Sequence, residues 1–271
     1  NIARDPGGNI IAGAIGGSYG GGYQILLAAF DDRLDAIVPT DTWNSLIQSL
    51  LPNEVIKKAF TAGLCLTATP ALDNAELGER VTAACDQAST NQTTRYLDDF
   101  MPTLTLTVDD VVQAFTVNSL AHLEERHNDG SDPFTMRPLN ALFIQGNRDI
   151  LFNMTEAANS YRFMQSLGGD VRLMTNESGH GIPTRMLGGS QGALGPSTCG
   201  RFDSLAATRA WFDLHLRGNG FAEQSLVPEI CISLGNNTGV LLNSLPVADA
   251  ASTQFDPFTV TIPAATAVTA A

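Results

Sequence analysis

Ser18, Asp149 and His180 are the residues of this chain whose types and order indicate covalent catalysis. A serine hydroxyl is a poor nucleophile at neutral pH, so it needs a histidine that accepts its proton. The histidine in turn needs a carboxylate that holds its ring in the correct tautomer. The chain supplies these groups in the order serine, acid, histidine, and each follows an apolar run typical of a buried strand. We therefore predict that Ser18 attacks, that His180 is the general base and that Asp149 orients His180.

The surroundings of Ser18 predict a sharp turn between a strand and a helix. An apolar run at 10–15 precedes Gly-Gly-Ser-Tyr-Gly at 16–20, and a helical run follows at 23–30. Gly-x-Ser-x-Gly in this setting is the nucleophile-elbow motif, in which small neighbours let the hydroxyl stand out. A phosphate-binding loop is the alternative. However, no Lys-Ser or Lys-Thr follows the glycines, and their spacing does not give Gly-x-Gly-x-x-Gly.

Other residues compete for the roles of acid and base. Asp41 also follows a predicted strand, but Asp149 stands in a Gly-x-x-Asp turn before the strand that delivers His180. His180 lies between two glycines directly after that strand, which favours it as the base. Of the three other histidines, His122 and His127 fall in the predicted cap region and His215 falls late in a predicted helix.

The oxyanion of an acyl-transfer reaction needs two hydrogen-bond donors. The backbone N–H of Tyr19, the residue after the nucleophile, supplies one of them. The second normally comes from a loop after an earlier strand, and only 17 residues precede Ser18. We therefore expect this donor to be missing, and we expect the chain to be an internal fragment of a longer hydrolase that is poorly active or inactive alone.

Alternating apolar strands and helices predict an α/β fold with a mostly parallel sheet. The expected strands are 10–15, 34–39, 139–144 and 170–175, and the expected helices are 23–30, 155–167 and 204–217. The region 46–137 interrupts this alternation with helical stretches at 45–60, 74–87 and 107–123. We expect it to form a helical cap, inserted into a catalytic domain that comprises 1–45 and 138–222.

The character of the sequence changes after residue 222. Short strands at 230–234, 240–242 and 258–262 predict the start of a separate all-β module, which ends in a frayed tail at 264–271.

Aromatic and polar residues near the predicted cap are candidates for a substrate pocket. Trp43, Asn44 and Phe115 are the candidates, together with Phe100 and Met101. Apolar residues at helical spacing are more often plain core than ligand contacts. The turn at 128–132 carries oxygen ligands but lacks the pattern of an EF-hand loop, so we expect an exposed turn there and no metal.

The amino-acid composition limits which classes of binding partner we expect. The net charge is −13, from 15 basic and 28 acidic residues. Such a surface argues against nucleic acid and anionic membranes as partners. No apolar run is long enough to cross a bilayer. We expect a small-molecule ester or peptide substrate and no cofactor.

The four cysteines allow two disulfides. The pairing with the shortest loops is Cys65–Cys85 and Cys199–Cys231, whereas four buried free thiols are the alternative. Disulfides would indicate a secreted or periplasmic protein, with the cytoplasm as the alternative location. No cysteine has a partner at the ligand spacing of a zinc site.

The sequence resembles the Xaa-Pro dipeptidyl-peptidase and cocaine-esterase-like family of serine hydrolases. The resemblance lies in Ile-Gly-Gly-Ser-Tyr-Gly-Gly-Gly at 15–22, Leu-Asp-Ala-Ile-Val-Pro at 34–39, Gly-x-x-Asp at 146–149 and Gly-His-Gly at 179–181. It implies an α/β-hydrolase fold with a helical cap and a C-terminal jelly-roll module. Members carry further strands before the elbow strand, so here that strand is expected at an exposed edge.

The resemblance implies hydrolysis of an ester or an Xaa-Pro peptide bond through an acyl-enzyme. A dipeptidase also needs a carboxylate for the free amine of its substrate, and the candidates in the cap are Asp109, Asp110, Glu124 and Glu125. The alternative is a non-catalytic binding or scaffold protein on a hydrolase fold.

Overall fold

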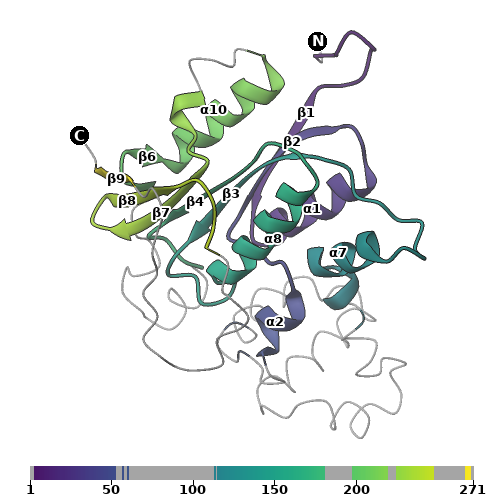
Figure 1. Cartoon of the computed structure of the whole chain (residues 1–271), viewed down its shortest axis with the longest axis horizontal. Helices are drawn as coiled ribbons and strands as arrows, with labels where there is room; N and C mark the ends of the chain where they lie inside the picture. Colours follow the sequence, from purple (N-terminus) through teal and green to yellow (C-terminus); the bar gives the residue numbers. More distant parts are fainter. Residues whose placement is uncertain are drawn as a thin grey trace, which may run out of the picture.

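The computed structural model describes residues 3–52, 57, 60, 113, 115–180, 197–218, 224–246 and 266–269, the last of these as backbone only. Its centre is a seven-stranded sheet with the order β1-β2-β3-β4-β7-β8-β9 (Figure 1). The bounds of these strands are β1 (Ala12–Gly17), β2 (Leu34–Thr40), β3 (Asn140–Gly146), β4 (Val171–Asn176), β7 (Ile230–Gly235), β8 (Thr238–Leu242) and β9 (Thr266–Thr269). The first five strands in this order run parallel, and β8 and β9 pair antiparallel.

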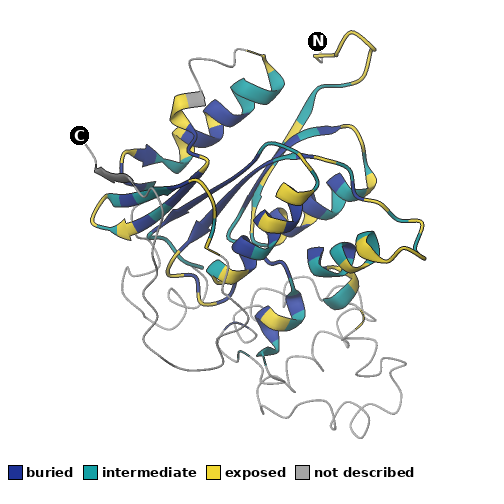
Figure 2. Ribbon diagram, in the orientation of Figure 1, coloured by how far each residue is buried: buried dark blue, intermediate teal, exposed yellow. Residues whose placement is uncertain are grey.

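Helices cover both faces of the sheet, as expected for a parallel α/β fold. On one face, α1 (Tyr19–Phe30) packs on β1 and β2, and α8 (Met154–Ser166) packs on β3 and β4. On the other face, α10 (Ser204–Leu216) packs across β1, β2 and β3. Buried residues therefore run along the central strands in Figure 2, on both faces of the sheet.

Alternate residues of each strand enter two hydrophobic cores. Ile37, Phe143 and Leu173 lie in the core beneath α1 and α8. Their neighbours along the strands point to the α10 face, where Trp211 is fully buried among them. Because both faces are covered, β3 is mostly apolar, and every residue of β4 is buried, including the polar residues Arg172, Thr175 and Asn176.

The elbow strand β1 lies at an edge of the sheet, as predicted. It pairs in parallel with β2 on one side, and within the described residues no strand pairs with its other side. Exposure alternates along β1, and the side chain of Ile15 is 59% exposed.

Two helices of the region 46–137 are described. α2 (Leu46–Leu50) begins at Ser45, whose side chain accepts a hydrogen bond from Gln48 N. α7 (Leu120–Asn128) packs against α1 and α8, and its Leu120 and Leu123 belong to the main core. The charged residues 124–127 therefore belong to the helix, and the chain turns after Asn128. The predicted helix at 74–87 lies outside the described residues.

The separate C-terminal β module is not confirmed. β7 pairs in parallel with β4, through Leu173 opposite Ile230 and Met174 opposite Cys231, and β8 pairs with β7. These strands therefore continue the main sheet. A tight turn at Asn236 and Asn237, both with positive φ, joins β7 to β8. The strand predicted at 258–262 lies outside the described residues.

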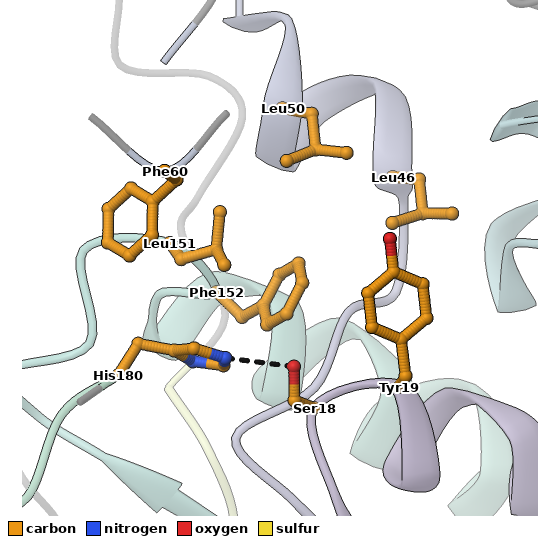
Figure 3. Close-up of a pocket in the computed structure, with 8 residues that line it drawn as sticks. All are labelled: Ser18, Tyr19, Leu46, Leu50, Phe60, Leu151, Phe152 and His180. Atoms are coloured by element: carbon orange, nitrogen blue, oxygen red, sulfur yellow. Dashed lines mark hydrogen bonds between the residues drawn. The ribbon is translucent and has the colours of Figure 1, made fainter. Parts of the chain in front are cut away.

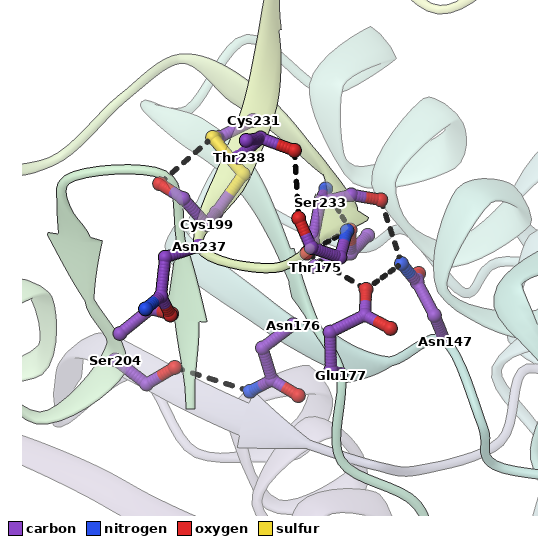
Figure 4. Close-up of a disulfide and its surroundings, with 12 residues drawn as sticks. Asn147, Thr175, Asn176, Glu177, Cys199, Ser204, Cys231, Ser233, Asn237 and Thr238 are labelled. Carbon is purple, nitrogen blue, oxygen red and sulfur yellow. Dashed lines mark hydrogen bonds between the residues drawn. A yellow bond between two sulfur atoms is a disulfide. The ribbon is translucent and has the colours of Figure 1, made fainter. Parts of the chain in front are cut away.

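The predicted Cys199–Cys231 disulfide is present. It ties β5 (Thr198–Cys199), which pairs with β6 (Phe202–Asp203), to strand β7 (Figure 4). The predicted Cys65–Cys85 bridge lies outside the described residues. Every helix that the structure describes is too short or too polar to traverse a lipid bilayer.

Candidate active site

Ser18, Asp149 and His180 meet at the carboxyl edge of the parallel strands. Ser18 follows β1, Asp149 follows β3 and His180 follows β4. His180 Nε2 lies 2.9 Å from Ser18 Oγ, and His180 Nδ1 lies 2.7 Å from Asp149 Oδ2 (the first contact is drawn in Figure 3). This geometry lets an imidazole accept the serine proton while the carboxylate fixes its tautomer. The catalytic roles themselves remain a prediction.

The backbone at Ser18 has a conformation that L-residues seldom adopt. Its φ is 55° and its ψ is −122°, and it directly precedes α1. Such a conformation costs about 1–3 kcal/mol and persists only where surrounding contacts fix it. Here Ser18 N donates to Thr40 O, and Ser18 O accepts from Thr42 Oγ1 and from the N–H groups of Gly21 and Gly22.

Close packing explains only some of the glycines in the elbow. A Cβ at Gly16 would lie 2.8 Å from the backbone of Gly20, and a Cβ at Gly22 would overlap the ring of Trp43. By contrast, a Cβ at Gly20 would meet no atom within 4 Å. The elbow therefore requires glycine at Gly16 and Gly22, although Gly20 completes the sequence motif.

Gln24 fixes the elbow from within and was missed by the sequence interpretation. This buried side chain donates to Gly16 O, Gly20 O and Val38 O, and it accepts from Val38 N. It thereby joins β1, α1 and β2 behind the serine. The sequence signal that could have identified Gln24 was a single amide side chain on an otherwise apolar helix face.

The turn after β3 holds the Asp149 carboxylate through its backbone. Asp149 Oδ1 accepts hydrogen bonds from Leu151 N and Phe152 N at 2.8 and 2.9 Å, which leaves Oδ2 for His180. The Asp149 side chain is fully buried, and that of His180 is 6% exposed.

Aromatic rings hold the imidazole from the side. Phe152 and Phe60 present T-shaped contacts to His180, with ring centroids 5.1 and 6.3 Å away. Trp43 packs against Phe152 at 5.3 Å and against Tyr19 at 5.4 Å. These contacts restrict rotation of the imidazole between Ser18 and Asp149.

An apolar pocket opens over the serine. Its cavity volume is about 40 Å³. Figure 3 shows leucine and phenylalanine side chains around the Ser18–His180 pair, with the Tyr19 hydroxyl directed toward Leu46. The lining residues are Ser18, Tyr19, Leu46, Leu50, Phe60, Leu151, Phe152 and His180. None of these carries a carboxylate.

Three of the five predicted pocket residues lie behind this lining, and the other two, Phe100 and Met101, lie outside the described residues. Trp43 is buried, and its Nε1 donates to Asn118 O. Asn44 is also buried, and its N–H donates to the carboxylate of Glu156. Phe115 packs on the core cluster that contains Trp43. The lining leucines and phenylalanines were missed, because α2 and the Asp149 turn meet only in the folded chain.

Comparison with models of known protein families identifies the family of this chain. Residues 6–182 match the family model described as X-Pro dipeptidyl-peptidase (S15 family). This chain belongs to the S15 peptidase family. Its members are serine hydrolases of the peptidase type, so the predicted resemblance is confirmed.

Among solved structures, the S15-family chain is similar to the uncomplexed acylaminoacyl peptidase of Pyrococcus horikoshii. The identity is 12% and the TM-score is 0.41, and the match covers 79% of this chain and 26% of that one. The chain thus spans about a quarter of the length of that peptidase. No curated protein matches the chain.

The backbone N–H of Tyr19 lies next to Ser18, at the N-terminus of α1. Tyr19 is the first residue of α1, where N–H groups have no intrahelical acceptor. The helix N-terminus adds partial positive charge at the same point. In the S15-family chain this N–H therefore remains the predicted donor.

The other histidines of the S15-family chain lie away from Ser18. His122 lies 3.9 Å from Glu125, His127 Nδ1 accepts from Met136 N, and His215 lies 3.2 Å from Asp170. These contacts give each imidazole a structural partner.

The carboxylates of the turn at 128–132 already have hydrogen-bond partners. Asp129 accepts from Ser131 N and Oγ, and Asp132 is paired with Arg126 at 2.7 Å. Within the described part of the chain, no group of acidic residues, histidines and cysteines is arranged to hold a metal ion.

A polar cluster supports the loop that carries His180. Glu177 accepts from Asn147 Nδ2 and Ser233 Oγ, and Asn176 Nδ2 donates to Ser204 Oγ (Figure 4). These contacts join the ends of β3, β4 and β7 to the start of α10. These hydrogen bonds thus hold the start of the His180 loop in place.

Proposed function

We propose that this S15-family chain hydrolyses an ester or Xaa-Pro peptide bond through an acyl-enzyme. Ser18 Oγ attacks the carbonyl carbon of the substrate and gives its proton to His180 Nε2. His180 then protonates the leaving alcohol or amine, and the scissile bond breaks. Water, deprotonated by His180, attacks the acyl-enzyme and releases the acid and free Ser18.

The observation that carries this proposal is the continuous contact from Ser18 Oγ through His180 to Asp149, at 2.9 and 2.7 Å. The strained elbow and the N-terminus of α1 support it, because an elbow of this kind exposes the hydroxyl and a helix N-terminus offers N–H donors beside it. Asp149 orients His180, and Tyr19 N–H binds the oxyanion.

The apolar pocket supports recognition of an apolar group on the acyl side of the scissile bond. Leu46, Leu50 and Phe60 surround the space above Ser18, and such a lining suits a proline ring or a short acyl chain equally. Glu124 and Glu125, considered as anchors for a substrate amine, lie on α7 and do not line the pocket. Asp109 and Asp110 lie outside the described residues.

Kinetics on paired substrates test the proposal. Short p-nitrophenyl esters are compared with Ala-Pro-p-nitroanilide and its N-acetylated form, using the wild type, Ser18→Ala and the control Ser166→Ala. We expect slow turnover of at least one substrate, because the second oxyanion donor is expected to be missing. This turnover should be lost in Ser18→Ala and unchanged in Ser166→Ala. A strict need for the free amine would assign a dipeptidyl-peptidase, and its absence an acyl esterase. Turnover that survives in Ser18→Ala would contradict the proposal.

A further inference from the structure

We propose that Asp41 is a positioning residue for the candidate triad, because it holds the turn that carries Asp149. The inference rests on the proposed function, because it assigns Asp41 a role in that same reaction. Asp41 itself touches neither Ser18 nor the pocket lining in the described contacts.

Asp41 is fixed on the end of β3 by both its backbone and its side chain. Its N–H donates to Ile144 O at 3.0 Å, and its carboxylate accepts from Gly146 N at 2.7 Å. The side-chain amide of Gln145 lies 3.4 Å from the same oxygen. Its φ is 44°, in the left-handed region, which aspartate tolerates better than most residues. This turn after β2 aims the carboxylate at the neighbouring strand.

The two groups that Asp41 contacts hold both ends of the turn that carries Asp149. Gly146 O accepts from Asp149 N at 3.1 Å. The Gln145 side chain donates to Phe152 O at 2.7 Å, and Phe152 N in turn donates to Asp149 Oδ1. A displacement of Gly146 and Gln145 would therefore move the Asp149 carboxylate.

The same turn is packed tightly against the loop of His180. Arg148 N donates to Ser178 O at 3.0 Å. A Cβ at Gly146 would overlap the carbonyl of Ser178, and a Cβ at Gly179 would lie 2.6 Å from Arg148 O. Because the two loops touch through their backbones, whatever fixes the Asp149 turn also fixes His180.

The carboxyl group of Asp41 is largely removed from water. Burial raises the pKa of Asp41 above its usual value, the hydrogen bond from Gly146 N opposes this, and the charges of Asp149 and His180 act in opposite directions.

Three variants test the positioning role. Asp41→Asn keeps an acceptor for Gly146 N, whereas Asp41→Ala removes it. Asp35→Asn is the matched control, because Asp35 lies at the opposite end of β2 and accepts from Ala12 N at 2.8 Å. The readouts are kcat and KM separately, thermal unfolding, and the NMR signal of the His180 Nδ1 proton, which reports the contact with Asp149.

The expected results differ between the variants. In Asp41→Ala, kcat falls about 10–100-fold while KM changes less than threefold, and the His180 Nδ1 proton signal shifts. Asp41→Asn retains most of the wild-type kcat, because its amide oxygen can still accept from Gly146 N. Asp35→Asn leaves kcat and the proton signal unchanged.

The NMR signal needs no turnover, so it tests the inference even if the wild type proves inactive and the proposed function fails. An unchanged His180 Nδ1 proton signal in Asp41→Ala would overturn the positioning role. A loss of kcat in Asp41→Ala that Asp41→Asn does not rescue would overturn it as well.

Discussion

The imidazole of His180 lies 2.9 Å from the hydroxyl of Ser18, although 162 residues separate them in the chain. Parallel strands produce this proximity, because their carboxyl ends meet at one edge of the sheet. The edge is held by side chains that take no part in the proposed chemistry, including Gln24 behind the elbow and Asp41 beside the acid turn.

The glycines of the elbow should differ in their tolerance of a methyl group. Gly16→Ala places a Cβ against the backbone of Gly20, so we expect a loss of about 1–3 kcal/mol in unfolding free energy and a fall in activity. Gly20→Ala is the matched change in open space within α1, so it should be neutral or stabilising by up to about 1 kcal/mol. Urea unfolding of both variants measures the difference. Equal destabilisation would contradict the packing that we describe.

Leu50 should control which acyl groups enter the pocket. Leu50→Ala enlarges the space above Ser18, so the ratio of kcat/KM for long against short acyl esters should rise about tenfold. Leu205→Ala, at a position 57% exposed on α10, is the control and should leave the ratio unchanged. An acyl-chain series measures both. A ratio that does not respond to Leu50→Ala would place the acyl group elsewhere.

The Cys199–Cys231 disulfide should contribute to stability. It closes a loop with a sequence separation of 32 residues, for which loop entropy gives a stabilisation of about 3.7 kcal/mol. The double variant Cys199→Ser, Cys231→Ser should therefore unfold at a lower denaturant concentration. Denaturant titration of the oxidised wild type and this variant provides the measurement, and coincident curves would show that the bridge adds nothing.

Asp170 should make stability depend on pH in acid. Burial raises the pKa of Asp170, but hydrogen bonds from His215 and Arg172 lower it more, to about 2. Because the unfolded value is higher, near 3.8, the stabilisation is complete above about pH 4 and is lost as the pH falls through 2. Asp170→Asn should thus be less stable than the wild type at pH 5. The difference in unfolding free energy between the two proteins should decrease toward pH 2.

A surface pair provides the control for Asp170. Asp213 is 2.8 Å from Arg217 on α10, and both side chains are partly exposed, so Asp213→Asn should change stability little at any pH. Unfolding free energies measured from pH 2 to 6 distinguish the two variants. If the unfolding free energies of the wild type and Asp170→Asn differed by the same amount over this whole range, the predicted link between stability and the pKa of Asp170 would be contradicted.

The sequence was sufficient for the features that are local. The apolar runs predicted strands β1 to β4, and Gly-x-Ser-x-Gly and Gly-His-Gly marked the turns that carry Ser18 and His180. The Gly-x-x-Asp turn before the strand of His180 favoured Asp149 over Asp41, and the structure places Asp149 2.7 Å from His180.

Features that depend on contacts between residues far apart in the chain could not be predicted from local sequence patterns. Glu156, a buried carboxylate, accepts from Asn44 N and Ser45 N, which are 112 and 111 residues away. β7 resembles an independent strand in sequence, and only its pairing with β4 shows that it extends the main sheet. α7 carries mostly polar residues, and only the fold shows that its Leu120 and Leu123 lie in the main core.

Labelling with a fluorophosphonate probe tests the central claim most directly. The probe reacts with an activated serine and needs no knowledge of the substrate, and intact mass with peptide mapping locates the label. We predict one label per chain at Ser18, lost in Ser18→Ala and strongly slowed in His180→Ala, with all three proteins folded. A folded wild type without a label, or a label at another serine, would contradict the assignment of Ser18 as the nucleophile.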